Sequence, residues 1–192
     1  FPTKRRVVTV NVEIQAPSFD TLSDAYLLRL LETEEDRLPR AAVDEFVRRG
    51  ERMIEPLVAM CRDEAAWQTD GGAFWAAVHA TFIVAAIGGE RAVTGLLEAL
   101  VQAEERHVEW VTDTLPSMFG KIGAPAVEGL MSFVADEKKS GLARWLAATC
   151  LGGVAVRHEA ERDRILDFLR EVAGHGDDYE VRAGAGAVLL DF

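Results

Sequence analysis

The sequence predicts an all-α protein, built as a stack of helical hairpins behind a short extended N-terminal arm. The first observation is a phrase that recurs as GERMIEPL at 50–57, GERAVTGL at 89–96 and GAPAVEGL at 123–130. The starts of these phrases lie 39 and 34 residues apart, a spacing typical of repeated helix pairs. The second observation is that each copy places a glycine where one helix would end and apolar residues where the next would begin.

Composition limits the classes of function. The 192 residues, 49% of them hydrophobic, suit one folded domain or one continuous stack. The net charge is −11, with 32 acidic against 21 basic residues, so nucleic acid and anionic membrane are poor partners and a basic protein or peptide fits better. No apolar run approaches the ~20 residues that span a bilayer. Cys61 and Cys150 lie in apolar helical stretches, as core thiols of a cytoplasmic protein do.

The N-terminal arm carries the one strand pattern of the chain. In VVTVNVEI, residues 7–14, apolar and polar residues alternate. A single strand does not form a stable sheet, so this segment lies along the helices, pairs with a second copy, or belongs to something upstream. We therefore expect an extended arm over 1–19 and one helical repeat domain over 20–192.

The helices follow from apolar spacing and from helix breakers. Asp20 or Ser23 caps the first helix, and Pro39 opens the next one, which ends at Gly50. Residues 74–87 are apolar almost all round, as in a helix enclosed by its neighbours. Further helices are expected around 54–60, 93–100, 108–119, 124–135, 141–151, 159–172 and 179–190.

Two breakers interrupt the second half of the chain. Pro116 is expected to kink the helix over 108–119. Gly152 and Gly153 are expected to end the helix that begins near 141 and to open a longer connection. The last helix has no partner, so it is either a natural end cap or part of a longer repeat chain.

The closing stretch DYEVRAGAGAVLLDF, at 178–192, resembles the first helix of a HEAT-like repeat, and RWLAATCLG at 144–152 has the same spacing. The stretch LPRAAVDEFVRRGERMIEPLVAMC, at 38–61, resembles a group of uncharacterised bacterial HEAT-like proteins, in which a Pro-Arg-x-Ala helix precedes an apolar-x-Pro-Leu helix. The resemblance implies a right-handed α–α superhelix of about four and a half helix pairs. It implies no particular activity.

HEAT-like repeats also occur in bilin lyases and in a group of DNA glycosylases. The glycosylase alternative needs a basic groove, which the charge balance opposes. The lyase alternative, in which the groove handles a ligand or cofactor, would need an apolar pocket with a converging histidine or cysteine. A scaffold that binds other proteins, without enzymatic activity, is the main expectation.

No catalytic, cofactor-binding or metal-binding residue is assigned. The sequence has no nucleophile elbow, phosphate loop, zinc-binding helix motif or Cys-x-x-Cys pair. His79 lies on the apolar helix and is expected to be a core residue with its polar atoms satisfied. His175, Asp177 and Asp178 form either a loop metal site or, as we prefer, a turn and a helix cap.

The tryptophans have two interpretations. Trp75, Trp110 and Trp145 are spaced by 35 residues, so we expect core packing between repeats, with an aromatic binding stripe as the alternative. Trp67 falls in a connecting loop and is the tryptophan expected to contact a partner.

The second helix of each pair is expected to line a groove. Leu97 and Leu130 belong to its buried side. A polar ladder lies on the opposite side, where a solvated face is the simpler interpretation and a partner site the functional one. Together with Trp67, the predicted partner-binding residues are Glu55, Thr94, Glu98, Glu128 and Ser132.

Overall fold

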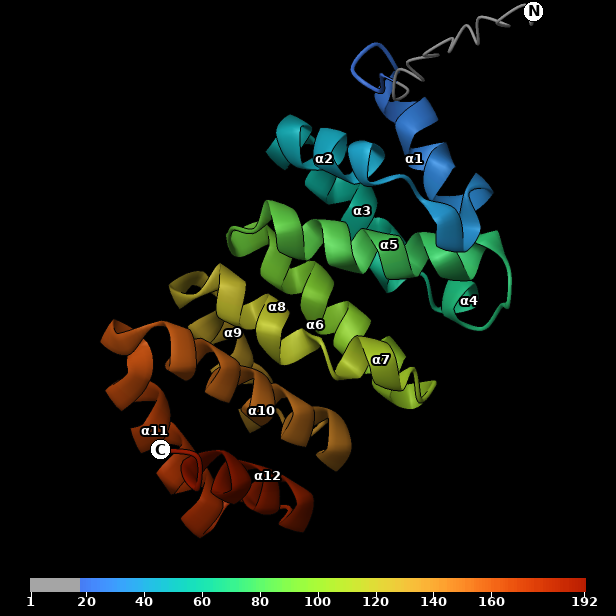
Figure 1. Ribbon diagram of the computed structural model, residues 1–192. Helices are drawn as coiled ribbons and strands as arrows, with labels where there is room; N and C mark the ends of the chain where they lie inside the picture. The colour runs from blue at the N-terminus through green and yellow to red at the C-terminus, as the bar shows by residue number, and fades with distance from the viewer. Residues whose placement is uncertain (1–17) are drawn as a thin grey trace, which may run out of the picture.

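The computed structural model describes residues 18–192, and within this range all regular structure is helical (Figure 1). The strand expected at 7–14 and most of the 1–19 arm lie outside the described residues. The α-helices are α1 Asp24–Thr33, α2 Arg40–Arg49, α3 Ile54–Arg62, α4 Glu64–Trp67, α5 Gly72–Ile87, α6 Glu90–Glu105, α7 Glu109–Thr112, α8 Leu115–Ile122, α9 Ala124–Ala135, α10 Gly141–Arg157, α11 Glu159–His175 and α12 Tyr179–Leu189. Short 3-10 turns cover Glu35–Arg37 and Gly50–Met53.

The helices contact one another in two rows. In the first row, α2 contacts α5, α5 contacts α8, α8 contacts α10 and α10 contacts α12. In the second row, α3 contacts α6, α6 contacts α9 and α9 contacts α11. Figure 1 shows α2, α5, α8, α10 and α12 following one another from the N-terminal to the C-terminal end of the molecule. Between residues 18 and 192, no helix is both long and apolar enough to cross a membrane.

The recurring phrase begins where the sequence places it, between the two helices of a pair. Gly50, Gly88 and Gly123 follow α2, α5 and α8 with φ of +62°, +77° and +77°, and Gly88 directly precedes the second copy of the phrase. Glycine adopts these positive φ angles at low cost because it has no Cβ. Ser23 is the cap of α1, since its Oγ accepts a hydrogen bond from the Tyr26 N–H at 3.2 Å.

The core runs through the whole stack. Leu130 is 0% exposed, as predicted, whereas Leu97 is only partly buried and packs against the edge of the core. Leu97 misses full burial because it lies at the edge of the α6 stripe, where it faces Gly129 of α9, a residue with no side chain. Cys61 and Cys150 are free and buried, and burial raises the pKa of the Cys61 thiol to about 12 and that of Cys150 well above its usual value.

The expected end of a helix at Gly152 and Gly153 is wrong. Helix α10 continues through both glycines to Arg157, and His158 alone separates it from α11. The glycines serve close packing instead, because a Cβ on Gly153 would overlap the Pro116 carbonyl and one on Gly120 would lie 2.6 Å from the Gly153 carbonyl. The backbones of α8 and α10 therefore touch at this crossing.

The interruption expected at Pro116 is a complete break between α7 and α8. Helix α7 ends at Thr112 and α8 starts at Leu115, with Pro116 in its first turn. Proline has no N–H to donate to the Thr112 carbonyl, and its ring disfavours the helical conformation of the residue before it. The first-row element of this repeat is thus two short helices in place of one.

Two buried arginines hold the ends of the described chain in place. Arg49 donates from Nε to Glu45 at 2.6 Å, from Nη1 to Asp24 at 2.6 Å, and from Nη2 to the carbonyls of Phe19 and Leu22. These bonds fasten the segment before α1 to α2. The hydrogen bonds from Arg48 and Arg49 lower the pKa of Glu45 from 4.5 to about 2.

Arg144 has the same function at the other end. Its Nε donates to the Val134 carbonyl at 2.7 Å, and its two terminal nitrogens donate to the two carboxylate oxygens of Asp177 at 2.9 and 2.6 Å. This fork joins α9, α10 and the turn before α12. The hydrogen bonds from Arg144 lower the pKa of Asp177 from 3.8 to about 2.

We expect these two carboxylates to make the fold acid-sensitive. Their folded-state pKa values lie below their unfolded values, so the stabilisation is complete above about pH 4.5 and is lost as the pH falls through about 2. Denaturation at a series of pH values should therefore show a steeper loss of unfolding free energy for the wild type than for Glu45→Gln or Asp177→Asn. The control Asp163→Asn, at an exposed position, should keep the wild-type slope. A wild-type slope in all three variants would contradict the assignment.

We also expect Gly153→Ala to destabilise the protein by about 1–3 kcal/mol, because the new methyl group would meet the backbone of Pro116 rather than a side chain that can move. Gly186→Ala is the matched control. It also lies within a helix, but a Cβ added at this position would have nothing within 4 Å of it. That control should leave stability unchanged or raise it by up to about 1 kcal/mol. Urea denaturation measures the unfolding free energy of both variants. Equal changes in the two would show that α8 and α10 are not in backbone contact.

Candidate functional site

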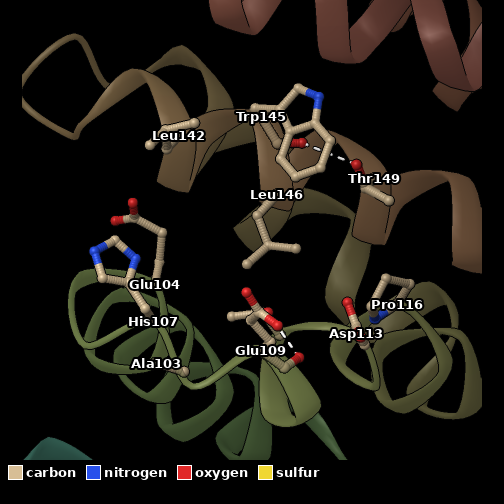
Figure 2. A pocket seen from close by; sticks show the side chains of 11 residues that line it. Ala103, Glu104, His107, Glu109, Asp113, Pro116, Leu142, Trp145, Leu146 and Thr149 are labelled. Atoms are coloured by element: carbon tan, nitrogen blue, oxygen red, sulfur yellow. Dashed lines mark hydrogen bonds between the residues drawn. The ribbon is translucent and has the colours of Figure 1, made fainter.

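A cleft of about 310 Å³ opens between the C-terminal end of α6, α7 and the N-terminal half of α10 (Figure 2). Its position follows from the two features described above. The glycines hold α10 against α8 near Gly153, while the break before Pro116 leaves α7 free to diverge from α10. The cleft forms where the two walls separate.

One wall of the cleft is apolar and belongs mainly to α10. Leu142, Trp145 and Leu146 line it, and Pro116 adds to it from α8. The Trp145 side chain is 40% exposed although its indole is well supported, because it packs over Gly184 of α12. A Cβ at position 184 would overlap the indole Cδ1, so the glycine creates the space that the ring occupies.

The opposite wall carries three carboxylates. Glu104 comes from the last turn of α6, Glu109 from the start of α7 and Asp113 from the turn that follows it. Figure 2 shows these side chains facing α10 across the cleft, with the His107 imidazole beside Glu104. Glu104 accepts a hydrogen bond from the Ser140 hydroxyl at 3.3 Å. Within residues 18–192, none of the three acids forms a salt bridge.

An aromatic cluster lies on the other side of α7. Trp110 is centred 6.0 Å from Trp75 and 6.1 Å from Phe82, and Trp75 stacks on His79 at 5.9 Å. Trp110 is 45% exposed and Phe82 is also exposed, so core packing is the wrong interpretation for Trp110, and likewise for Trp145. These rings lie on the outer surface of the first row, where helix spacing alone does not separate burial from exposure.

His79 is half-buried within this cluster, so the expectation of a core residue is wrong, because the ring packs beside Trp75 on the outer side of α5. Its Nε2 lies 2.5 Å from the Glu35 carbonyl.

Trp67 is not the exposed tryptophan that the sequence suggested. It is 3% exposed, its Nε1–H donates to the Cys61 carbonyl at 2.9 Å, and its ring meets Phe74 edge-on. The connection expected to be a loop contains the short helix α4, capped by Asp63, which folds the indole back onto the core. Trp67 is therefore unavailable to a partner.

The predicted second-helix ladder is on the surface, but its acids already have partners. Glu55 pairs with Arg91 at 2.6 Å and Glu98 with Arg62 at 3.3 Å, each across α3 and α6. Glu128 of α9 pairs with Arg164 of α11. Each of these arginines belongs to the neighbouring second-row helix, so the ladder largely neutralises itself. Thr94 and Ser132 are exposed on the same helices, and none of the predicted partner-binding residues lines the cleft.

The turn before α12 is a cap and an ion pair. Asp178 Oδ1 accepts from the N–H groups of Glu180 and Val181, while Asp177 is held by Arg144. In the described part of the chain, no group of three His, Cys, Asp or Glu side chains could hold a metal ion.

Sequence reasoning missed the cleft residues for identifiable reasons. Glu104 stands in a charge run that is typical of a solvated face. Glu109 and Asp113 are four residues apart, a spacing that places them on one side of a helix. The sequence predicts an interruption at Pro116, but not that this side then faces α10. The tryptophan spacing gave no signal either, because Trp75, Trp110 and Trp145 lie at the same distance before the C-caps Gly88, Gly123 and His158 of their first-row helices.

Comparisons with models of protein families, with curated proteins and with solved structures give no match. Over residues 18–192 the fold is all-helical, and in its cleft an apolar wall faces three carboxylates that lack arginine or lysine partners in the same range.

We expect Trp67 and Trp110 to have opposite roles in stability. Trp67→Ala should cost about 3–5 kcal/mol, because it removes a buried ring and leaves the Cys61 carbonyl without its donor. Trp110→Ala should cost about 1 kcal/mol or less, because nearly half of its surface is already in water. Chemical denaturation of both variants measures the difference. If Trp110 were the costlier site, the placement of α4 and α7 would be wrong.

Proposed function

We propose that this chain is a HEAT-like, right-handed α–α superhelix without enzymatic activity, and that it binds a basic segment of a partner protein in the cleft between α7 and α10. The observation that carries the proposal is the three carboxylates of Glu104, Glu109 and Asp113, which face an apolar wall and have no cationic partner among residues 18–192. The sequence resemblance and the two rows of helices support the superhelix.

Charge favours a basic partner at the cleft rather than at the ladder. Arginines neutralise the acids at 55, 98 and 128, and a partner would have to break those pairs before it could use them. The three cleft acids have no such ion pairs to break. The net charge of −11 adds long-range attraction for a cationic segment and speeds its encounter.

The thiols argue against the lyase-like alternative. A cysteine that attacks a ligand does so as a thiolate, and burial raises the pKa values of Cys61 and Cys150 far above neutral pH. Neither cysteine lines the cleft, and the histidine that does, His107, is exposed at its rim. Two buried free thiols suit a reducing cytoplasm, where we place the protein.

The test is a peptide-library selection followed by affinity measurement on matched variants. The cleft variant carries Glu104→Gln, Glu109→Gln and Asp113→Asn, and the ladder control carries Glu55→Gln, Glu98→Gln and Glu128→Gln. Both variants remove three negative charges. Peptides selected by the wild type should be rich in arginine and lysine and should bind less tightly as salt is raised.

We expect the cleft variant to lose about tenfold or more in affinity, because it removes the charges that meet the cation, and the ladder control to stay within about twofold. Fluorescence anisotropy with the selected peptides measures both. Selection of acidic or uncharged peptides, or an equal loss in the ladder control, would reject the proposal.

A further inference from the structure

We propose that the side chain that anchors the partner in this cleft is an arginine, with its guanidinium plane on the Trp145 indole and its N–H groups on the α6–α7 carboxylates. This inference rests on the proposed function and makes it specific, since the cleft chemistry selects one cationic side chain over another.

The volume of the cleft limits the size of the group that it can bind. Its volume of about 310 Å³ is at the lower end of the ~300–1,000 Å³ typical of ligand pockets. It therefore suits one long side chain better than a large ligand. The apolar wall of Leu142 and Leu146 gives the methylene stem of such a side chain a surface to cover, while the charged end reaches the acids.

The Trp145 indole favours a flat cation over a compact one. Trp145 lies beside Leu146 and Thr149 on the α10 wall, across the cleft from Glu109 and Asp113 (Figure 2). Gly184 provides the space for the ring, so its position is determined before any partner arrives. A flat, held indole is the best aromatic surface for a planar cation.

The distribution of acceptors separates arginine from lysine. The three carboxylates stand at successive positions along α6 and α7 instead of at one point. A guanidinium has five N–H donors in one plane and can address two carboxylates while its face rests on the indole. An ammonium is a compact, strongly hydrated charge with no flat face, so it must give up either the indole or one of the acids.

The aromatic lining also disfavours methylated lysine. Methylammonium groups are recognised by cages of several aromatic rings, whose faces surround the cation. Trp145 and the His107 imidazole are the aromatic side chains among the described residues that line this cleft. Trp75, Phe82 and Trp110 form their cluster on the other side of α7 and do not line it.

The experiment compares peptides that differ at one position. The probe is acetyl-Gly-Leu-Arg-Leu-Gly-amide, with lysine, citrulline or trimethyllysine in place of arginine, and titration calorimetry on the full chain measures each affinity. The arginine peptide should bind about tenfold more tightly than the lysine peptide, the equivalent of one charge-assisted hydrogen bond. The citrulline peptide, which keeps the planar end but lacks the charge, should bind too weakly to measure.

Three variants test the role of the indole. Trp145→Leu should weaken the arginine peptide by roughly 2- to 30-fold and remove its advantage over lysine. Gly184→Ala should act in the same direction, because it displaces the indole without removing any side chain that lines the cleft. Trp110→Leu, on the far side of α7, should change neither affinity by more than about twofold. Circular dichroism and thermal melting establish that each variant is folded.

The outcomes separate this inference from the proposed function. Equal or tighter binding of the lysine or trimethyllysine peptide overturns the arginine anchor and leaves a basic-segment site in place. Binding of neither the arginine nor the lysine peptide at millimolar concentration overturns both. An arginine preference that survives in Trp145→Leu and Gly184→Ala overturns the stacking on the indole.

Discussion

The contact between the backbones of α8 and α10 is the constraint on which the rest of this structure depends. Gly120 and Gly153 let the two helices touch, at a place where any side chain would meet a carbonyl oxygen. A contact of this kind fixes the point at which α8 and α10 cross. The break before Pro116 then separates α7 from this packed pair. Helices α8 and α10 stay packed at the crossing, and the cleft opens between α7 and α10.

The distribution of charge follows a second constraint, which is that buried or crowded acids need a cation. At the ends of the described chain, Arg49 and Arg144 satisfy Glu45 and Asp177, and along the second row arginines satisfy the ladder acids. Because arginines already engage the ladder acids, the acids that face the apolar wall of the cleft are better placed to meet an external cation. The net charge of −11 alone could not indicate that place, because it counts paired and unpaired acids alike.

Much of the fold could be predicted from the sequence because it depends on local rules. The turn glycines at 50, 88 and 123 and the helices α5 and α12 follow from spacing and backbone preference, but α5 is not enclosed on all sides, since Phe82 is exposed on its outer face. Gly152 and Gly153 show where such rules stop. A glycine pair marks a helix end in most contexts, but it also permits two helices to touch, and only the three-dimensional arrangement tells which applies.

The tryptophans show the same limit for the site. The sequence predicts Trp67 at the surface and Trp110 in the core, and the structure reverses them, because burial depends on how the short helices α4 and α7 fold back. The cleft depends on that folding too, so its acids could be recognised as acids from the sequence but not as neighbours of Trp145.

The arginine site in the cleft is tested most directly by following the indole N–H signals of the four tryptophans by nitrogen-edited NMR while the arginine peptide is added. If the peptide binds in the cleft, the Trp145 signal shifts in a saturable way and the signal of buried Trp67 does not move. Saturable shifts at Trp75 and Trp110 with an unchanged Trp145 would place the partner on the aromatic cluster and would rule out the cleft.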